Sequence, residues 1–189
     1  RVEPAGAPVT TPPASVDPAV PATGWDRVFP GLSRTLVATG HDEPYGPADG
    51  TPQWRNSRPD VGRVDDQGVF HARRPGSSKV SAVRDRARGD TELTVLGELR
   101  RLEPTQSRVA LADDEASGTF GLMGFDAAGH SAPVEPADVR LSYDRERFAI
   151  APAASGGHFT VRARPGVTSA AATVRATVDG HSTVLAVTV

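Results

Sequence analysis

Short apolar segments alternate with turn residues between Trp54 and Val80, and this alternation most limits what the chain can fold into. Trp54 opens a short strand, residues 56–60 and 66–68 form turns, and residues 69–70 begin the next strand. Each apolar segment is too short to do more than cross a small sheet. The stretch therefore predicts a small β domain, and it contains no catalytic machinery of its own.

The same pattern of strands and turns continues on both sides of this stretch. Before it, residues 28–29 and 32–39 read as two strands separated by the tight turn Pro30-Gly31. After it, residues 77–83 and 91–96 read as paired antiparallel strands, with residues 84–90 as the charged turn between them. In that turn, Arg-Gly-Asp at 88–90 matches an integrin-recognition tripeptide, although a chance match at a hairpin tip is the favoured interpretation.

Strand signals are equally frequent in the second half of the chain. The Asp179-Gly180 pair predicts a type I′ hairpin, because both positions of that turn need a positive φ. Seven strands in about 90 residues are typical of a β-sandwich. The predicted strands are residues 107–111, 118–125, 138–143, 147–151, 158–164, 169–178 and 182–189.

A Pro-rich segment precedes the predicted strands. Residues 1–25 combine frequent prolines with little charge, which favours an extended polyproline II spacer that Trp25 anchors on the first domain. A proline-rich docking ligand is the alternative interpretation. We therefore divide the chain into a linker at 1–25, a first domain at 26–97 and a second at 98–189, with residues 97–104 crossing between the domains.

Composition excludes several partners and sites. The net charge is −2 and the arginines are scattered among acids, so nucleic acid is not expected as a partner. No apolar run is long enough to span a membrane. The sequence has no Cys, which excludes a disulfide framework and a thiolate zinc site. The chain begins at Arg1 and its sole Met is Met123, so we expect it to be a fragment or a processed product.

No cluster of residues in the sequence predicts catalysis. The histidines form no HExxH or His-x-His pattern, and the acid pairs fall in predicted turns, where Asp ordinarily bonds its own backbone. We therefore assign no catalytic, cofactor-binding or metal-binding residue, and no cofactor. The residues considered are His41, His71, His130, His158, His181, Asp65, Asp66, Asp113, Asp114, Glu115, Asp144 and Glu146.

The longest predicted loop, residues 40–52, leaves one binding question open. His41, Asp42, Glu43 and Asp49 lie close together in sequence and could collect Ca²⁺ through oxygen ligands. Their order lacks the EF-hand spacing, which favours a solvated loop.

The central stretch resembles a known family of domains. WRNSRPDVGRVDDQGVFHARRPGSSKVSA is similar to bacterial immunoglobulin-like domains of the second group, with a Pro-Asp-Val-x-x-Val step and an Asp-x-x-Gly-Val turn. The resemblance covers residues 26–97 and implies an immunoglobulin-like β-sandwich; FDAAGHSAPVEPADV extends it to the second domain, with His130 in place of the usual Asn. The fold class expected is therefore all-β, with two tandem immunoglobulin-like sandwiches and Trp54 as the core tryptophan of the first.

The resemblance also implies a role and a location. Members of that family are spacers or adhesive modules in exported, multidomain bacterial proteins. The resemblance therefore implies that the partners are other domains of the same polypeptide, outside the cell or at its surface. RVFPGLSRTLVATGHDEPYGPADGTPQWR further resembles the all-β region of actinobacterial phosphodiester glycosidase proteins, which would place a catalytic domain outside this chain.

A binding module is the alternative function. The 40–52 loop or arginine-bearing strands would hold cell-wall glycan or another anionic polymer. The residues concerned are Arg162, Arg164 and Arg175, with Trp25, Tyr45 and Tyr143 as the available aromatic platforms.

Overall fold

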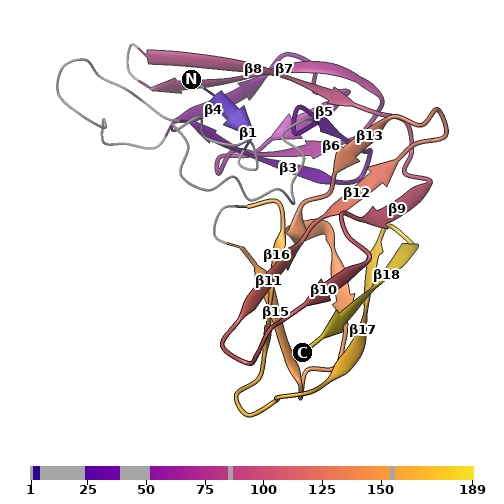
Figure 1. The fold of residues 1–189 in the computed structure, drawn as a ribbon. Helices are drawn as coiled ribbons and strands as arrows, with labels where there is room; N and C mark the ends of the chain where they lie inside the picture. Colours follow the sequence, from indigo (N-terminus) through magenta and orange to yellow (C-terminus); the bar gives the residue numbers. More distant parts are fainter. Residues whose placement is uncertain (1, 5–23, 39–51, 85–86, 154–155) are drawn as a thin grey trace.

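A computed structural model of the protein contains eighteen short strands and one 3-10 turn in the residues that it describes. The structure describes residues 2–4, 24–38, 52–84, 87–153 and 156–189. The strands separate into two groups, which we call the first module (β1–β8) and the second module (β9–β18) (Figure 1). The chain is thus all-β, as predicted, and the domain limits 26–97 and 98–189 remain predictions.

Two four-stranded sheets form the first module. Their orders are β1-β3-β6-β5 and β2-β8-β7-β4. The strands are β1 (Val2–Pro4), β2 (Arg27–Val28), β3 (Ser33–Ala38), β4 (Gln53–Asn56), β5 (Gly62–Val64), β6 (Val69–Ala72), β7 (Gly76–Arg84) and β8 (Ala87–Val95).

Three sheets form the second module, in the orders β13-β12-β9, β10-β18-β17-β14 and β11-β16-β15. The elements are β9 (Arg101–Pro104), β10 (Arg108–Ala110), β11 (Ser117–Phe120), β12 (Leu122–Phe125), β13 (Ser131–Pro133), the 3-10 turn η1 (Pro136–Asp138), β14 (Arg140–Ser142), β15 (Phe148–Pro152), β16 (Phe159–Ala163), β17 (Ala171–Val178) and β18 (His181–Thr188).

The two modules repeat one topology. In each, an early strand pairs in parallel with the last strand: β2 with β8, and β10 with β18. The last strand then pairs with the preceding strand, and a separate sheet packs across the core, as in an immunoglobulin-like sandwich.

Each module also contains a copy of the same tight turn. Asp65 accepts hydrogen bonds from the N–H groups two and four residues later, and Asp126 does the same. The third residue after each Asp is a glycine with φ of +84°, Gly68 in one module and Gly129 in the other. A side-chain-capped turn with a left-handed glycine therefore recurs at matching places in the modules.

Several expectations about strands are confirmed and others are wrong. Asp179 and Gly180 have φ of 45° and 79°, as the hairpin prediction required. The charged turn at 84–90 is wrong, because Ala87–Val95 form β8 and continue the hairpin. Residues 101–104 form β9 instead of crossing between modules, and the strand predicted at 118–125 breaks at Gly121 into β11 and β12, which belong to different sheets.

The two ends of the predicted linker are part of the folded structure. Val2–Pro4 form β1, which pairs with β3, and Trp25 is 3% exposed. The rest of that segment lies outside the described residues. Trp54, predicted as the core tryptophan, is only half-buried and packs over Gly68, whereas Trp25 is the fully buried tryptophan.

Candidate functional site

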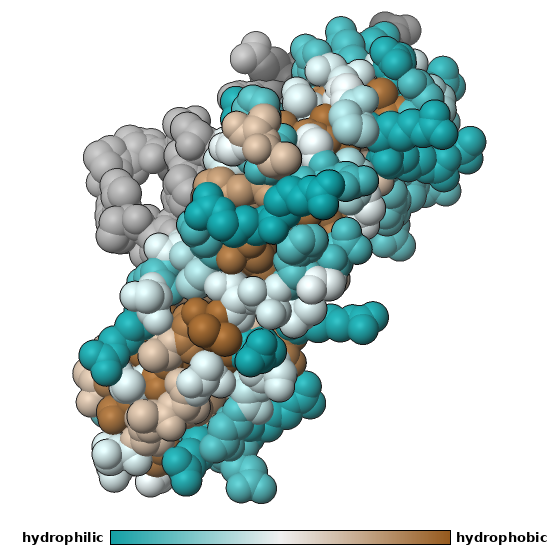
Figure 2. Space-filling model, turned by 90° about the vertical axis from the view of Figure 1, so that its right-hand side faces the viewer, coloured by the Kyte–Doolittle hydropathy of each residue, from teal (hydrophilic) through white to brown (hydrophobic). Residues whose placement is uncertain are grey.

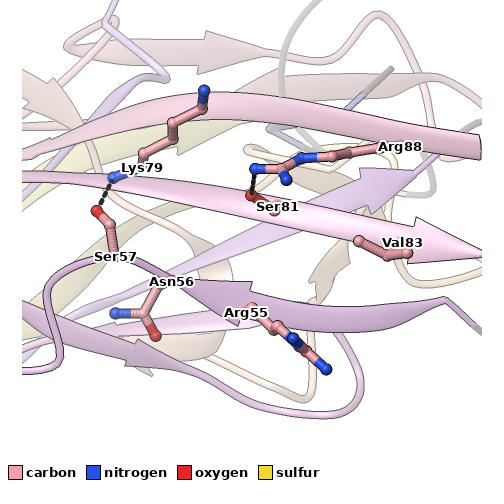
Figure 3. A pocket seen from close by; sticks show the side chains of 7 residues that line it. All are labelled: Arg55, Asn56, Ser57, Lys79, Ser81, Val83 and Arg88. Carbon is pink, nitrogen blue, oxygen red and sulfur yellow. Dashed lines mark hydrogen bonds between the residues drawn. The ribbon is translucent and has the colours of Figure 1, made fainter.

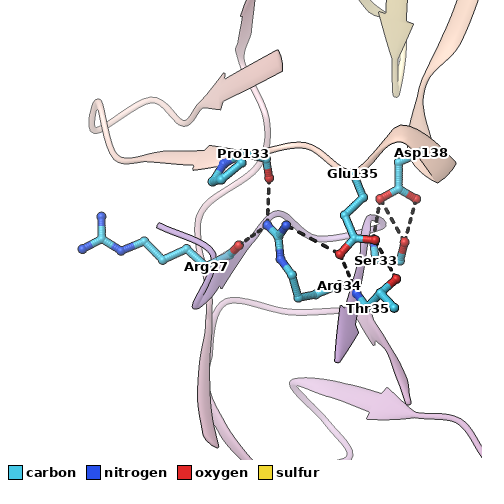
Figure 4. Close-up of polar contacts among 7 residues, drawn as sticks. All are labelled: Arg27, Ser33, Arg34, Thr35, Pro133, Glu135 and Asp138. Atoms are coloured by element: carbon cyan, nitrogen blue, oxygen red, sulfur yellow. Dashed lines mark hydrogen bonds and ion pairs between the residues drawn. The ribbon is translucent and has the colours of Figure 1, made fainter. Parts of the chain in front are cut away.

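Arg34 lies buried where the two modules meet. It lies on the same face of the chain as Leu36 of β3 and Leu32 just before that strand, both of which are core residues, and its side chain is 1% exposed. Its Nη2 donates to the carbonyls of Arg27, at 2.5 Å, and of Pro133 in the second module, at 2.7 Å (Figure 4). One guanidinium thus bonds the backbones of both modules.

The charge of Arg34 is balanced from the second module. Its Nη1 lies 3.7 Å from Oε1 of Glu135, and its guanidinium carbon lies 4.7 Å from the centre of the Trp25 ring. Burial lowers the pKa of Arg34 to about 10, although Glu135 and Asp138 act to raise it. The side chain is therefore a cation at neutral pH.

Two carboxylates of the second module accept hydrogen bonds from the backbone edge of β3. The Thr35 N–H and hydroxyl donate to Glu135, at 2.5 and 2.7 Å. The Ser33 N–H and hydroxyl donate to Asp138, at 2.8 and about 3.0 Å. Burial raises the pKa of Asp138, against the opposing effect of the Ser33 hydrogen bonds. The segment Ser33-Arg34-Thr35 is thus held on both sides by residues more than 95 positions away.

Glycines in the second module receive aromatic rings from the first. A Cβ on Gly124 would lie 2.5 Å from the Phe29 ring and 2.6 Å from Leu99. A Cβ on Gly157 would lie 2.2 Å from the Trp25 ring. These rings approach the backbone as closely as glycine allows, and we call Gly124 and Gly157 the glycine notches.

The connection between the modules is fixed along its length. The N–H of Leu96 donates to Val28, that of Gly97 to the Asp126 carboxylate, and that of Arg100 to Phe125. Leu96 and Leu99 are 8% and 4% exposed and belong to one apolar cluster that runs through both modules. The arrangement can therefore hold the modules at one angle.

The residues considered for catalysis are dispersed in the structure. His71 lies 3.1 Å from Asp65, and His130 lies 3.1 Å from Asp126, each beside the repeated turn of its own module. His181 follows the Asp179-Gly180 turn in β18, and His158 precedes β16. Within the described residues, no three His, Asp or Glu side chains come together as a metal site. His41 and the 40–52 loop lie almost wholly outside the described residues.

The acid pairs serve turns, as expected from their positions. The side chains of Asp65, Asp113 and Asp144 each accept hydrogen bonds from two backbone N–H groups that follow them in the chain. The donors are Gln67 and Val69, Glu115 and Ala116, and Glu146 and Arg147, respectively. Asp114 accepts from the N–H of Gly166. These hydrogen bonds account for the acids as local structure.

The predicted glycan-binding residues do not form one surface. Trp25 is buried in the junction, so it cannot serve as an aromatic platform, and the Tyr143 hydroxyl bonds the backbone of Ile150. Arg162 and Arg175 occupy outward positions on β16 and β17, which belong to different sheets of the sandwich. Tyr45 lies outside the described residues.

Hydrophobic side chains are scattered on the outer surface. Val37 and Val184 are the large hydrophobic residues most exposed in the described part of the chain, at 47% and 48%. Figure 2 shows brown surface broken up by white and teal, with the teal concentrated on the upper, first module. In that same described part, no helix is long and apolar enough to cross a membrane.

A hollow on the first module is the remaining candidate for binding. It has a volume of about 240 Å³ on the outer face of β4, β7 and β8 (Figure 3). Seven residues line it, and three of them are cationic: Arg55, Asn56, Ser57, Lys79, Ser81, Val83 and Arg88. The Arg88-Gly89-Asp90 tripeptide is part of strand β8 here, so the predicted display at a hairpin tip is wrong.

The sequence around Arg34 contains a signal for the junction that strand alternation alone does not reveal. Arg34 stands between Leu32 and Leu36 at a spacing of two, which places a charge on the core face of a strand. Such a residue needs partners, and these come from residues 133–138. No local pattern could have named them.

Comparison with known proteins gives no family assignment. No protein-family model and no curated protein matches this chain. Among solved structures, domains 4 and 5 of the S-layer protein SbsC share 19% identity over 82% of this chain and 80% of that chain, with a TM-score of 0.37. Domains 5–6 of SbsC share 11% over 85% and 91%, with a TM-score of 0.42.

The Escherichia coli adhesin FdeC shares 15% identity over 84% of this chain and 59% of that chain, with a TM-score of 0.33. The chain spans 23% of the length of SbsC domains 1–6. Because these identities and TM-scores are low, we take no function from them.

Proposed function

We propose that this chain is a non-catalytic module of a cell-surface or exported protein, in which two immunoglobulin-like sandwiches act as one stiff unit. The junction at Arg34 carries the proposal. A buried cation bonded to both modules, aromatic rings seated in glycine notches and a pinned connection all oppose rotation of one module against the other. A stiff pair is suited to holding attached domains at a set distance and orientation.

Limited proteolysis tests the stiffness. Trypsin cuts after arginine, and Arg100 and Arg101 follow the buried Leu99. In the intact protein we expect residues 96–104 to resist cleavage, because a segment must open to enter the protease. Arg34→Ala should make the same segment sensitive, whereas Arg58→Ala, at an exposed ion pair, should not. Equal cleavage of all three proteins would contradict a locked junction.

An activity assay tests the non-catalytic character. We expect no turnover of an aryl sugar phosphodiester above the blank. Turnover that survives repurification would contradict the proposal. A phosphodiester glycosidase as the parent protein depends on the sequence resemblance alone, because no comparison supports it.

Adhesion to a cell wall is the second candidate, and the cationic hollow on β4, β7 and β8 favours it. Co-sedimentation with purified bacterial walls at low and moderate salt provides the test. Retention at moderate salt supports recognition, whereas binding lost with salt indicates only weak charge attraction. If the protein does not bind walls at either salt concentration, adhesion is contradicted and the spacing role is the one that remains.

A further inference from the structure

We propose that the hollow on the outer face of β4, β7 and β8 binds one unit of an anionic wall polymer, through a carboxylate or phosphodiester group and the sugar beside it. This proposal rests on the second candidate function, adhesion to a cell wall, and adds the binding site and the chemistry of the ligand. It is carried by the position, pairing and charge of the residues that line the hollow.

Strand pairing places these residues in rows across three strands. Arg55 of β4 lies beside Ser81 of β7, which lies beside Asp90 of β8. In the next row, Val83 pairs with Arg88. Alternate residues of β7, Ser78, Val80 and Ala82, are buried beneath. The lining residues therefore stand on a packed sheet, and their backbone positions are fixed before any ligand arrives.

One carboxylate orients two of the cations. Asp90 lies 2.9 Å from Nζ of Lys79 and 2.9 Å from Nε of Arg88. Hydrogen bonds from Ser81, Lys79 and Arg88 hold the pKa of Asp90 below its usual range. Arg88 also donates to the Ser81 hydroxyl at 3.2 Å. Lys79 and Arg88 are thus held side by side with donors left for a ligand.

Arg55 supplies the cation that Asp90 does not neutralise. The structure shows no ion pair for Arg55 among the described residues. Arg55 on β4 and Arg88 on β8 lie on opposite sides of β7 (Figure 3). The cations Arg55, Lys79 and Arg88 share this face with the carboxylates of Asp90 and Glu92, so its net charge is +1. An anionic group is the complement of this face, and arginine forks bind carboxylates and phosphates well.

The remaining lining suits a sugar better than a bare ion. Val83 gives the hollow an apolar side against which the C–H face of a sugar ring can pack. The Ser57 hydroxyl accepts the N–H of Lys79 and keeps its own proton to donate. The volume of 240 Å³ lies just below that of enclosed small-molecule sites, which fits one unit of a polymer running over the surface.

Binding to defined polymers tests the site. Polygalacturonate carries carboxylates, wall teichoic acid carries phosphodiesters, and dextran is neutral. We expect the intact protein to bind at least one acidic polymer and not dextran, and the comparison of the first two identifies the acidic group. Failure to bind either acidic polymer, or equal binding of dextran, would overturn the proposal.

Paired variants separate the site from general charge attraction. Arg55→Gln with Arg88→Gln should weaken binding about tenfold or more, the size expected for two exposed charge contacts. Arg162→Gln with Arg164→Gln removes the same charge from exposed positions on the second module and should change the affinity less than about twofold. Equal losses in the two variants would show that no built site exists.

Co-sedimentation with whole walls distinguishes this inference from adhesion in general. If the Arg55→Gln and Arg88→Gln variant no longer sediments with walls, the result supports both adhesion in general and the hollow as the binding site. If the variant still sediments with walls like the unaltered protein, adhesion stands and the hollow is not its site.

Discussion

Arg34 occupies a position that its strand otherwise reserves for apolar residues. Its Nε and Nη1 and the Trp25 Nε1 are buried without hydrogen-bond partners among the described residues. Burying a charge with incomplete hydrogen bonding costs free energy, so Arg34 is not the most stabilising residue for its place. Arg34 instead provides hydrogen bonds to both modules, and these can form only when the modules have one relative orientation.

Removing Arg34 alone should destabilise the protein strongly. Arg34→Met leaves Glu135, which is 7% exposed, without its cation. We expect the free energy of unfolding to fall by about 3 kcal/mol, as measured by urea denaturation. Arg34→Met with Glu135→Gln should recover part of the loss, because no charge is then left unpaired.

The exposed pair Arg58–Asp60 is the control for this cycle. Its side chains are 57% and 55% exposed, so Arg58→Met should cost less than about 1 kcal/mol. If Arg34→Met were no worse than Arg58→Met, the junction would contribute nothing to stability.

Asp126 should make the stability depend on pH. Burial alone would raise its pKa, but hydrogen bonds from His130, Gly97 and Ala128 lower it below the ordinary value. A lowered pKa in the folded state gives stability that is present above the unfolded pKa of about 3.9 and is lost as the pH falls through the folded value.

Asp126→Asn should therefore reduce the unfolding free energy at pH 7, and this difference from the unaltered protein should shrink in strong acid. Asp66→Asn, at an exposed turn residue, removes a carboxylate without those hydrogen bonds and should have little effect. A pH-independent deficit in Asp126→Asn would contradict the assignment.

The two tryptophans should differ in their contribution to stability. Trp25 is 3% exposed and fills a glycine notch, so Trp25→Ala should cost about 3–5 kcal/mol. Trp54 is half-buried, and Trp54→Ala should cost less. Thermal melting of the two variants compares them, and a larger effect at Trp54 would place the main core tryptophan in β4 after all.

Strand β12 carries the notch that admits Phe29. Gly124→Ala would press a methyl group against the Phe29 ring and Leu99, and overpacking of this kind costs about 1–3 kcal/mol. Adding Phe29→Leu should restore part of the stability, because a smaller side chain leaves room for the methyl group. Urea denaturation of the single and double variants measures this, and the absence of any rescue would mean that the two residues are not in contact.

Local patterns predicted most of the elements. Alternation found strands such as β6, β16 and β17, and the Asp179-Gly180 dipeptide found its hairpin, because these features depend on neighbouring residues. β9 and β13 were missed, since each is short and is defined by pairing with β12. The extent of β8 was missed because its charged residues suggested a turn, although they face outward on a hairpin.

The whole molecule was predictable only in outline. Two tandem immunoglobulin-like sandwiches follow from the number of strands and from the resemblance to bacterial immunoglobulin-like domains. The junction did not follow, since it joins Trp25, Phe29 and Arg34 to residues about a hundred positions away. Contacts between residues so far apart in the chain produce no local pattern of apolar and polar residues from which they could be predicted.

A locked junction predicts a single spacing between the modules, and distances between two spin labels test this most directly. The chain has no Cys, so labels attach only where cysteine is introduced, at Arg63→Cys on β5 and Arg162→Cys on β16, both exposed. We predict one narrow distance distribution that salt does not change, and a broad one when Arg34→Met and Gly124→Ala are added. A broad distribution in the otherwise unaltered protein would contradict the stiff unit on which the proposed function depends.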